Sequence, residues 1–154
     1  MIYFAYGADL NPGRMAERAP GYRTIGVARL DGYWLGFPRS SALERTALPA
    51  IVPDPGGAVW GALYEVPEED IPILHHLHDF DPDGPAGRND HDLLPVEVTR
   101  PGQADSVRAV TYVPLPDGTS SLPSAAYMAM LIEGARYHGL PRTYLAALQS
   151  IRTA

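Results

Sequence analysis

The sequence contains no cysteine and no lysine. The absence of cysteine excludes disulfides, thiolate zinc sites and a cysteine nucleophile. All 12 basic residues are arginine, and the missing lysine amine excludes Schiff-base chemistry and a P-loop. The chain also lacks a G-x-G-x-x-G segment after a strand and a G-x-S-x-G motif, so we expect no cofactor.

Long apolar runs and basic stripes are missing as well. No run approaches the roughly 20 residues that a membrane helix needs, and no charged-then-apolar leader opens the chain. We therefore expect a cytoplasmic protein without a membrane partner. The net charge of −6 and the scattered arginines argue against a nucleic-acid partner, because neutralisation of phosphates supplies most non-specific affinity. The sequence does not indicate an oligomeric state.

The 154 residues, 45% of them hydrophobic, are enough for one globular domain with a real core. We predict a single domain over 1–154. Alternating and β-branched segments predict a strand at 2–6, a strand pair over 22–37 with a turn at Asp31-Gly32, and strands at 48–52, 58–66, 93–100 and 107–113. Breaker-rich segments predict loops at 38–49 and 79–90 and a turn at 53–57.

Two helices are predicted between these strands, and two more after the last of them. An N-cap side chain followed by proline at Asn11-Pro12 predicts a helix to about residue 19, and 67–70 begins a helix that should end near His78. Pro123 begins the longest helix, and a short one follows to Ile151. The pattern predicts a mixed α/β (α+β) fold, in which a curved, mostly antiparallel sheet or barrel is flanked by a few helices.

Four segments resemble the γ-glutamylcyclotransferase-like family, also known as AIG2-like. Residues 3–10 read YFAYGADL where that family usually has YFAYGSNL. Three further similar segments follow in the family's order: 27–30, 59–66, and a closing stretch that comprises 123–127, 134–135 and 138–144. Together the four span nearly the whole chain. The resemblance implies a transferase- or lyase-type enzyme that cyclises the γ-glutamyl group of a small amine or peptide to 5-oxoproline and releases the amine.

The first segment has a physical interpretation of its own. A strand that ends at Gly7 and leads into a helix leaves backbone N–H groups that favour an anion, although it can equally be an ordinary turn in which glycine supplies a positive φ. The resemblance implies that this loop holds the glutamyl part of the substrate. The corresponding substrate-binding residues here are Tyr6, Gly7, Ala8, Asp9 and Leu10.

Asp9 stands where the family usually has asparagine. A carboxylate that points inward would repel an anionic ligand, by about 4 kcal/mol at 4 Å and an effective dielectric near 20. Asp9 therefore turns away from the pocket, is protonated, or indicates a different substrate.

The family's general base is a glutamate in an L-D-x-x-E-G segment. Alignment from Leu77 puts Asp81 in the glutamate position, whereas alignment from Leu74 puts His78 there. We prefer Asp81 because it keeps a carboxylate that can take a proton from the substrate ammonium and give one to the leaving nitrogen. The alternative for Asp81 is a solvated residue in an acidic loop.

Two further positions match the family's pocket. His91 stands where the family commonly has a tyrosine, and Tyr127 matches a tyrosine whose hydroxyl binds substrate. An ordinary core aromatic on an amphipathic helix is the other interpretation of Tyr127.

Two alternatives to the cyclotransferase stay open. The altered loop and the missing glutamate also fit a non-catalytic module that binds a small ligand on the same fold. The cluster around His75, His76, His78, Asp79 and Asp81 also has the side chains of a metal-dependent hydrolase. We assign no metal ligand, because this pattern matches no metalloenzyme signature and histidine is favoured in the last turn of a helix.

Overall fold

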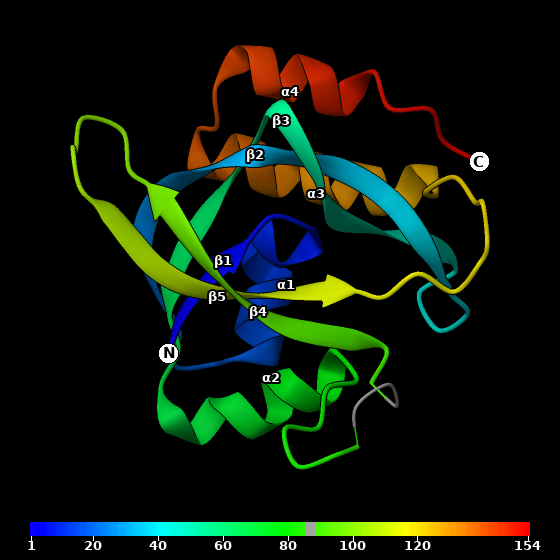
Figure 1. Ribbon diagram of the computed structural model, residues 1–154, viewed down its shortest axis with the longest axis horizontal. Coiled ribbons are helices and arrows are strands. Elements are labelled where there is room, and N and C mark those ends of the chain that lie inside the picture. The colour runs from blue at the N-terminus through cyan, green and yellow to red at the C-terminus, as the bar shows by residue number, and fades with distance from the viewer. Residues whose placement is uncertain (86–88) are drawn as a thin grey trace.

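The computed structural model describes residues 1–85 and 89–154, and five of its strands close into a barrel in the order β1-β3-β2-β4-β5 (Figure 1). The strands are β1 (Ile2–Ala5), β2 (Arg23–Ser41), β3 (Thr46–Glu65), β4 (His91–Thr99) and β5 (Ser106–Pro114). All neighbouring pairs are antiparallel except β1 and β5, which are parallel at the pair Tyr3 and Val110. The predicted mixed fold with a mostly antiparallel barrel is confirmed.

The prediction was wrong about where the chain reverses between residues 22 and 66. β2 runs through Asp31-Gly32, and β3 runs through the expected turn at 53–57. Only residues 42–45, within the expected loop at 38–49, connect the two strands. The turn residues instead lie at or near irregularities in the pairing, such as the shift between Asp31 and Tyr33. Such irregularities bend long strands around a barrel, so the signal marks curvature and not a reversal.

The helices begin and end close to where the sequence predicts. They are α1 (Pro12–Arg18), α2 (Ile71–Leu77), α3 (Ala125–His138) and α4 (Arg142–Gln149), with short 3₁₀ turns η1 (Ala8–Leu10) and η2 (Glu68–Asp70). Side-chain caps open two of them: Asn11 accepts a hydrogen bond from the backbone N–H of Gly13, and Ser124 accepts one from that of Tyr127. α3 ends at Gly139, whose φ of 72° favours glycine.

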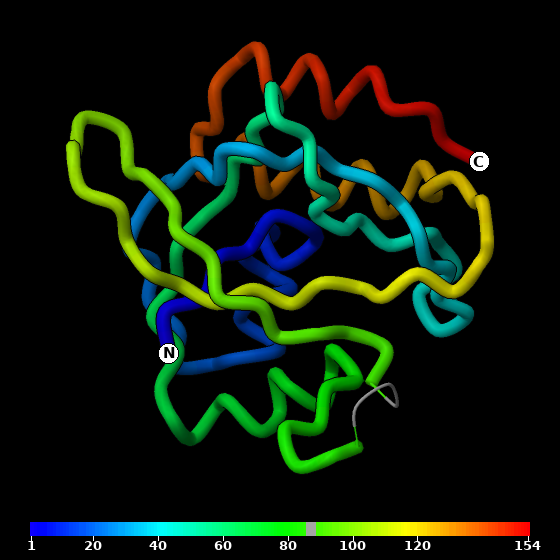
Figure 2. The backbone as a smooth tube through the Cα atoms, in the orientation of Figure 1, coloured from blue at the N-terminus to red at the C-terminus, as the bar shows by residue number. Residues whose placement is uncertain are grey.

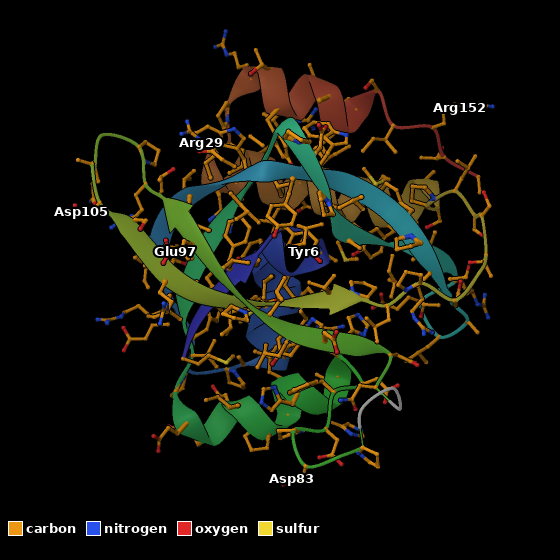
Figure 3. The ribbon with its side chains drawn as sticks, in the orientation of Figure 1. Tyr6, Arg29, Asp83, Glu97, Asp105 and Arg152 are labelled. Carbon is orange, nitrogen blue, oxygen red and sulfur yellow. The ribbon has the colours of Figure 1, made fainter. Side chains whose placement is uncertain are left out.

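The helices cover opposite sides of the barrel. α3 and α4 lie along the side formed by β2 and β3, whereas α2 lies on the other side, below β4 in Figure 1. The tube in Figure 2 shows the first turn after β1 enclosed between these two sides. Figure 3 shows Tyr6 in the interior and Glu97, Asp105 and Arg152 at the periphery. No helix in the described residues is long and apolar enough to cross a membrane.

α3 packs directly against the backbone at the end of η1, because Gly134 has no side chain at the point of contact. A Cβ atom at Gly134 would lie 2.4 Å from the backbone nitrogen of Asn11 and 2.4 Å from the carbonyl carbon of Leu10. Leu10 and Leu131 are fully buried at this junction. This close packing fixes η1, which begins the candidate site.

Candidate active site

The loop after β1 is held from both sides by hydrogen bonds to its backbone. The hydroxyl of Tyr64 donates to the carbonyl of Asp9 at 2.8 Å, and Nε2 of His138 lies 3.0 Å from the carbonyl of Leu10. Gly7 has a φ of −107°, so it is not a positive-φ glycine. Its Cβ position lies 3.2 Å from both Pro49 and the Tyr127 hydroxyl, so close approach is what favours glycine here.

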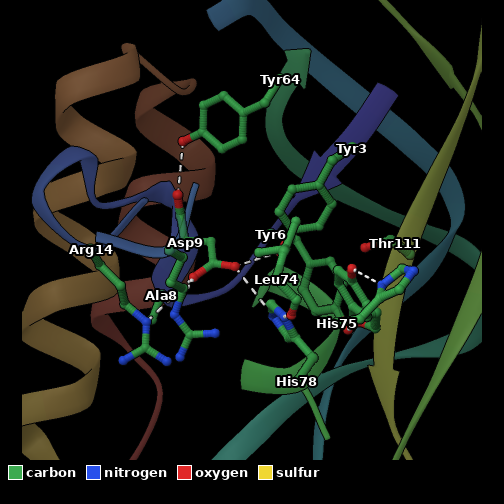
Figure 4. A network of polar contacts seen from close by, with 12 residues as sticks. Tyr3, Tyr6, Ala8, Asp9, Arg14, Tyr64, Leu74, His75, His78 and Thr111 are labelled. Atoms are coloured by element: carbon green, nitrogen blue, oxygen red, sulfur yellow. Dashed lines mark hydrogen bonds and ion pairs between the residues drawn. The ribbon is translucent and has the colours of Figure 1, made fainter. Parts of the chain in front are cut away.

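Asp9 points into the interior, where its side chain is 4% exposed (Figure 4). The hydroxyl of Tyr3 donates to its Oδ2 at 2.7 Å, and Nε2 of His78 lies 3.2 Å from the same oxygen. The Nε atoms of Arg14 and Arg18 lie 3.4 and 3.3 Å from Oδ1. The possibility that Asp9 turns away from the interior is therefore wrong: its carboxylate points inward and has cationic partners, which the sequence did not predict.

These partners decide the ionisation of Asp9. Burial alone would raise its pKa, but the hydrogen bond and charge of His78, the charge of Arg18 and the Tyr3 hydroxyl outweigh burial and hold the pKa well below its usual range. The carboxylate is therefore ionised at neutral pH, and it neutralises part of the positive charge around it.

His78 reaches this carboxylate because α2 ends one residue earlier. It is the C-cap of α2, and its Nδ1 lies 2.9 Å from the carbonyl oxygen of Leu74. Since a carbonyl only accepts hydrogen bonds, Nδ1 carries the proton of that bond. The imidazole also stacks on Tyr112, with ring centroids 3.9 Å apart and planes 3° from parallel. The orientation of the ring is thus fixed on two sides.

Two arginines of α1 connect the carboxylate to the turn between β2 and β3. Arg14 and Arg18 are one helical turn apart and lie on one face of α1. Both form ion pairs with Asp9 and also with Glu44 in that turn. Their charges are therefore shared between two carboxylates.

A cavity of about 500 Å³ opens beside this network. Seven of the residues predicted for the site line it: Tyr6, Gly7, Ala8, Asp9, His78, His91 and Tyr127. Two do not. Leu10 is fully buried in the core, and Asp81 is exposed in the loop after α2, where its Oδ1 accepts a hydrogen bond from the backbone N–H of Asp83.

Tyr127 and His91 are neutral groups in the lining. Burial raises the pKa of Tyr127, and its hydroxyl accepts a hydrogen bond from the N–H of Ala8 at 3.1 Å, which leaves its own proton available to a ligand. Burial, followed by the charges of His78 and Arg39, lowers the pKa of His91 to about 3. The His91 ring meets that of His78 edge-on, with centroids 5.6 Å apart.

His75 in α2 and His78 at its C-cap do not converge on a common point. Nδ1 of His75 lies 2.6 Å from the Tyr112 hydroxyl, whereas Nδ1 of His78 faces a backbone carbonyl. Among the residues that the structure describes, no group of three or more candidate ligands is arranged to hold a metal ion. The geometry therefore gives no support to the metal-dependent alternative.

Sequence reasoning missed several residues of the network. Tyr3, Arg14, Arg18, Glu44 and Tyr112 all line the cavity. The spacing of Arg14 and Arg18 on the helix after the glycine loop was a usable signal. Nothing local marks Glu44 or Tyr112, because their role depends on contacts distant in the sequence.

Comparisons with known proteins agree with this architecture. The model of the AIG2-like family matches residues 58–148, which is more than half of the chain. The gamma-glutamylcyclotransferase of Bos taurus is 29% identical over 154 residues, with coverage of 97% of this chain and 78% of the relative. That of Homo sapiens is 27% identical over 155 residues, with the same coverage of 97% and 78%. A solved gamma-glutamyl cyclotransferase structure is 25% identical and superposes with a TM-score of 0.89, with coverage of 100% of this chain and 89% of the other. The chain belongs to the AIG2-like family.

Proposed function

We propose that this protein cyclises the γ-glutamyl group of a small amine or peptide to 5-oxoproline and releases the amine. The observation that carries the proposal is the contact between His78 and Asp9 inside the cavity, at 3.2 Å. It brings the segment that holds the base in the family to the loop that holds the glutamyl group. Relatives named gamma-glutamylcyclotransferase at 29% and 27% identity support the same reaction class.

The reaction requires little covalent help. The α-amine of the substrate loses a proton and attacks its own γ-carbonyl carbon, the new C–N bond closes the lactam, and the original amide bond breaks as its nitrogen takes up a proton. Intramolecular attack has a large effective molarity when the bound geometry is right. The protein must then bind the substrate, take one proton and return one.

We assign the proton transfer to Nε2 of His78. Nδ1 is held by the carbonyl of Leu74, so Nε2, which faces Asp9 at 3.2 Å, is the nitrogen that we assign to proton exchange. Once Nε2 has taken the substrate proton, it can donate to the Asp9 carboxylate 3.2 Å away, which also orients the ring. Asp81 remains the alternative base, although it is exposed and does not line the cavity.

The remaining lining residues supply binding groups. The neutral Tyr127 hydroxyl can donate a hydrogen bond to a substrate oxygen, and Arg14 and Arg18 provide positive charge for a carboxylate of the substrate. Glu44 and Asp9 already balance these arginines in part. A zwitterionic glutamyl head group, which carries both charges, suits such a mixed surface better than a simple anion does.

The test is release of 5-oxoproline from a panel of γ-glutamyl amines and dipeptides. We expect His78→Ala to lower kcat by about 100-fold or more, as for removal of a proton-transfer group. Asp81→Asn is the matched control and should stay within about threefold of wild type. If Asp81→Asn abolishes turnover and His78→Ala does not, the proton is carried by Asp81 and our assignment of His78 is wrong.

One observation favours a second candidate, a non-catalytic module that binds γ-glutamyl compounds. Both ring nitrogens of His78 face oxygens that accept hydrogen bonds, the Leu74 carbonyl and the Asp9 carboxylate. A histidine that donates a hydrogen bond from both ring nitrogens has no free lone pair to act as a base. Calorimetric binding of a γ-glutamyl dipeptide without any turnover would favour the binding module over the enzyme.

A further inference from the structure

The turn between β2 and β3, residues 42–45, brings an apolar side chain to the mouth of the cavity. Leu43 in this turn is 93% exposed, yet it lines the cavity. An apolar side chain in that position is covered only when a ligand lies against it. Its removal from water then favours ligands that present an apolar surface to it.

The turn is anchored to the charged part of the site. Glu44 forms ion pairs with Arg14 and Arg18, and its backbone N–H donates to Oγ of Ser41 at 3.1 Å. The same two guanidinium groups contact Asp9. The position of Leu43 is therefore coupled, through Glu44, to the two arginines that also contact Asp9.

The cavity is lined by both charged and apolar side chains. Asp9, His78, Arg14 and Arg18 make up what we call the charged part of the wall. The apolar lining residues, which we call the apolar rim, are Ala42, Leu43, Leu48, Pro49, Leu77 and Pro114, and the lining also includes the polar residues Arg39, Ser40, Ser41, His76, Asp79 and Asp90. A γ-glutamyl compound likewise combines an ionic head group with a separate leaving group, to which it is joined through an amide.

We propose that the apolar rim binds the leaving group and that Leu43 makes the site prefer γ-glutamyl compounds whose leaving amine carries an apolar side chain. This inference rests on the proposed function, since it assigns the charged part of the wall to the glutamyl head. It names a substrate preference and the residue that produces it.

The test compares kcat/KM for γ-glutamyl-leucine and γ-glutamyl-glycine, which differ only in the apolar side chain of the leaving group. We expect wild type to prefer the leucine compound by about tenfold, as for partial burial of one aliphatic side chain. Leu43→Ser should reduce this ratio to about threefold or less. Leu122→Ser is the matched control, because Leu122 is 45% exposed and does not line the cavity, and it should leave the ratio unchanged.

A second variant tests the anchor. Glu44→Gln keeps Leu43 but weakens the ion pairs with Arg14 and Arg18, and it should also lower the ratio. A wild-type ratio near one, or an equal fall of the ratio in Leu43→Ser and Leu122→Ser, would overturn the inference and leave cyclisation standing. If neither compound is turned over, their calorimetric affinities decide: a tenfold preference for the leucine compound that Leu43→Ser removes supports the inference while refuting cyclisation.

Discussion

Replacing Asp9 with asparagine should destabilise the protein far more than a similar change at the surface. The amide would keep the shape of the side chain but remove the charge that pairs with His78, Arg14 and Arg18. Breaking a buried ion pair typically costs about 3–5 kcal/mol, because a buried charge is left uncompensated. Both arginines keep Glu44, so we expect the lower end, about 3 kcal/mol, or a fall in Tm of about 6–12 °C for a chain of this size.

The assay is urea unfolding at pH 7.5, followed by circular dichroism and tryptophan fluorescence. Asp31→Asn is the control, because Asp31 also pairs with an arginine, Arg29, but at an exposed position. Exposed pairs contribute about 0–1 kcal/mol. If the two substitutions cost the same, the idea that Asp9 is the central charge of the site has failed.

A double-mutant cycle tests the pair directly. His78→Gln removes the cation that faces Asp9, so the loss in the double variant should be smaller than the sum of the single losses by about 1–3 kcal/mol. If the two single losses add within about 0.5 kcal/mol, the 3.2 Å contact between His78 and Asp9 contributes no measurable interaction energy.

The pH dependence of the Asp9→Asn effect has a defined sign. Because the pKa of Asp9 is lowered in the folded protein, the ionised carboxylate contributes fully to stability above the unfolded pKa of 3.8. This contribution is lost as the pH falls through the folded pKa. The difference between wild type and Asp9→Asn should narrow by about 1 kcal/mol between pH 7.5 and pH 3. A difference that widens on acidification would refute the ion-pair explanation.

Two further predictions concern stability. The pKa of His91 is lowered from 6.5 to about 3, so the contribution of the neutral ring to stability is complete above pH 6.5 and is lost on acidification. Between pH 7.5 and 4.5, wild type should lose about 2 kcal/mol more of its unfolding free energy than His91→Gln, as measured by urea titration. Equal losses would contradict the lowered pKa. Alanine usually stabilises a helix interior by about 1 kcal/mol relative to glycine. Gly134→Ala should instead destabilise the protein by about 2 kcal/mol or more, because the added Cβ would lie 2.4 Å from backbone atoms of Leu10 and Asn11. Gly56→Ala is the calorimetric control, because a Cβ atom at Gly56 would have no atom within 4 Å beyond its chain neighbours, and equal Tm values for the two variants would contradict this packing.

Local signals in the sequence identified the elements around the site with little error. The apolar run at 2–5 forms β1, and Asn11 caps α1 as its residue type indicates. The helix before the expected base ends at Leu77, so the prediction that it stops near His78 is confirmed. These features depend on neighbouring residues only, because helix caps and short strands are determined by residues that are close in the sequence.

The course of β2 and β3 was predicted less well for a physical reason. Asp31-Gly32 has the composition of a hairpin turn, yet it lies inside a strand. Whether such a dipeptide reverses the chain or only bends it depends on the partner strand, and β2 and β3 are paired from Arg23 with Glu65 to Ser41 with Thr46. A closed barrel imposes this curvature, and no local pattern reports it.

The sequence by itself determined the family resemblance, the mixed fold and the glycine loop that begins the site. It left two candidates, His78 and Asp81, for the same role. Only the tertiary structure decided that His78 lines the cavity and that Asp81 faces solvent, because α2 is packed so that its C-cap, not the loop beyond it, meets η1. It also decided the charge of Asp9, since the pKa of a carboxyl group depends on which cations surround it, and those come from residues on other elements of the fold.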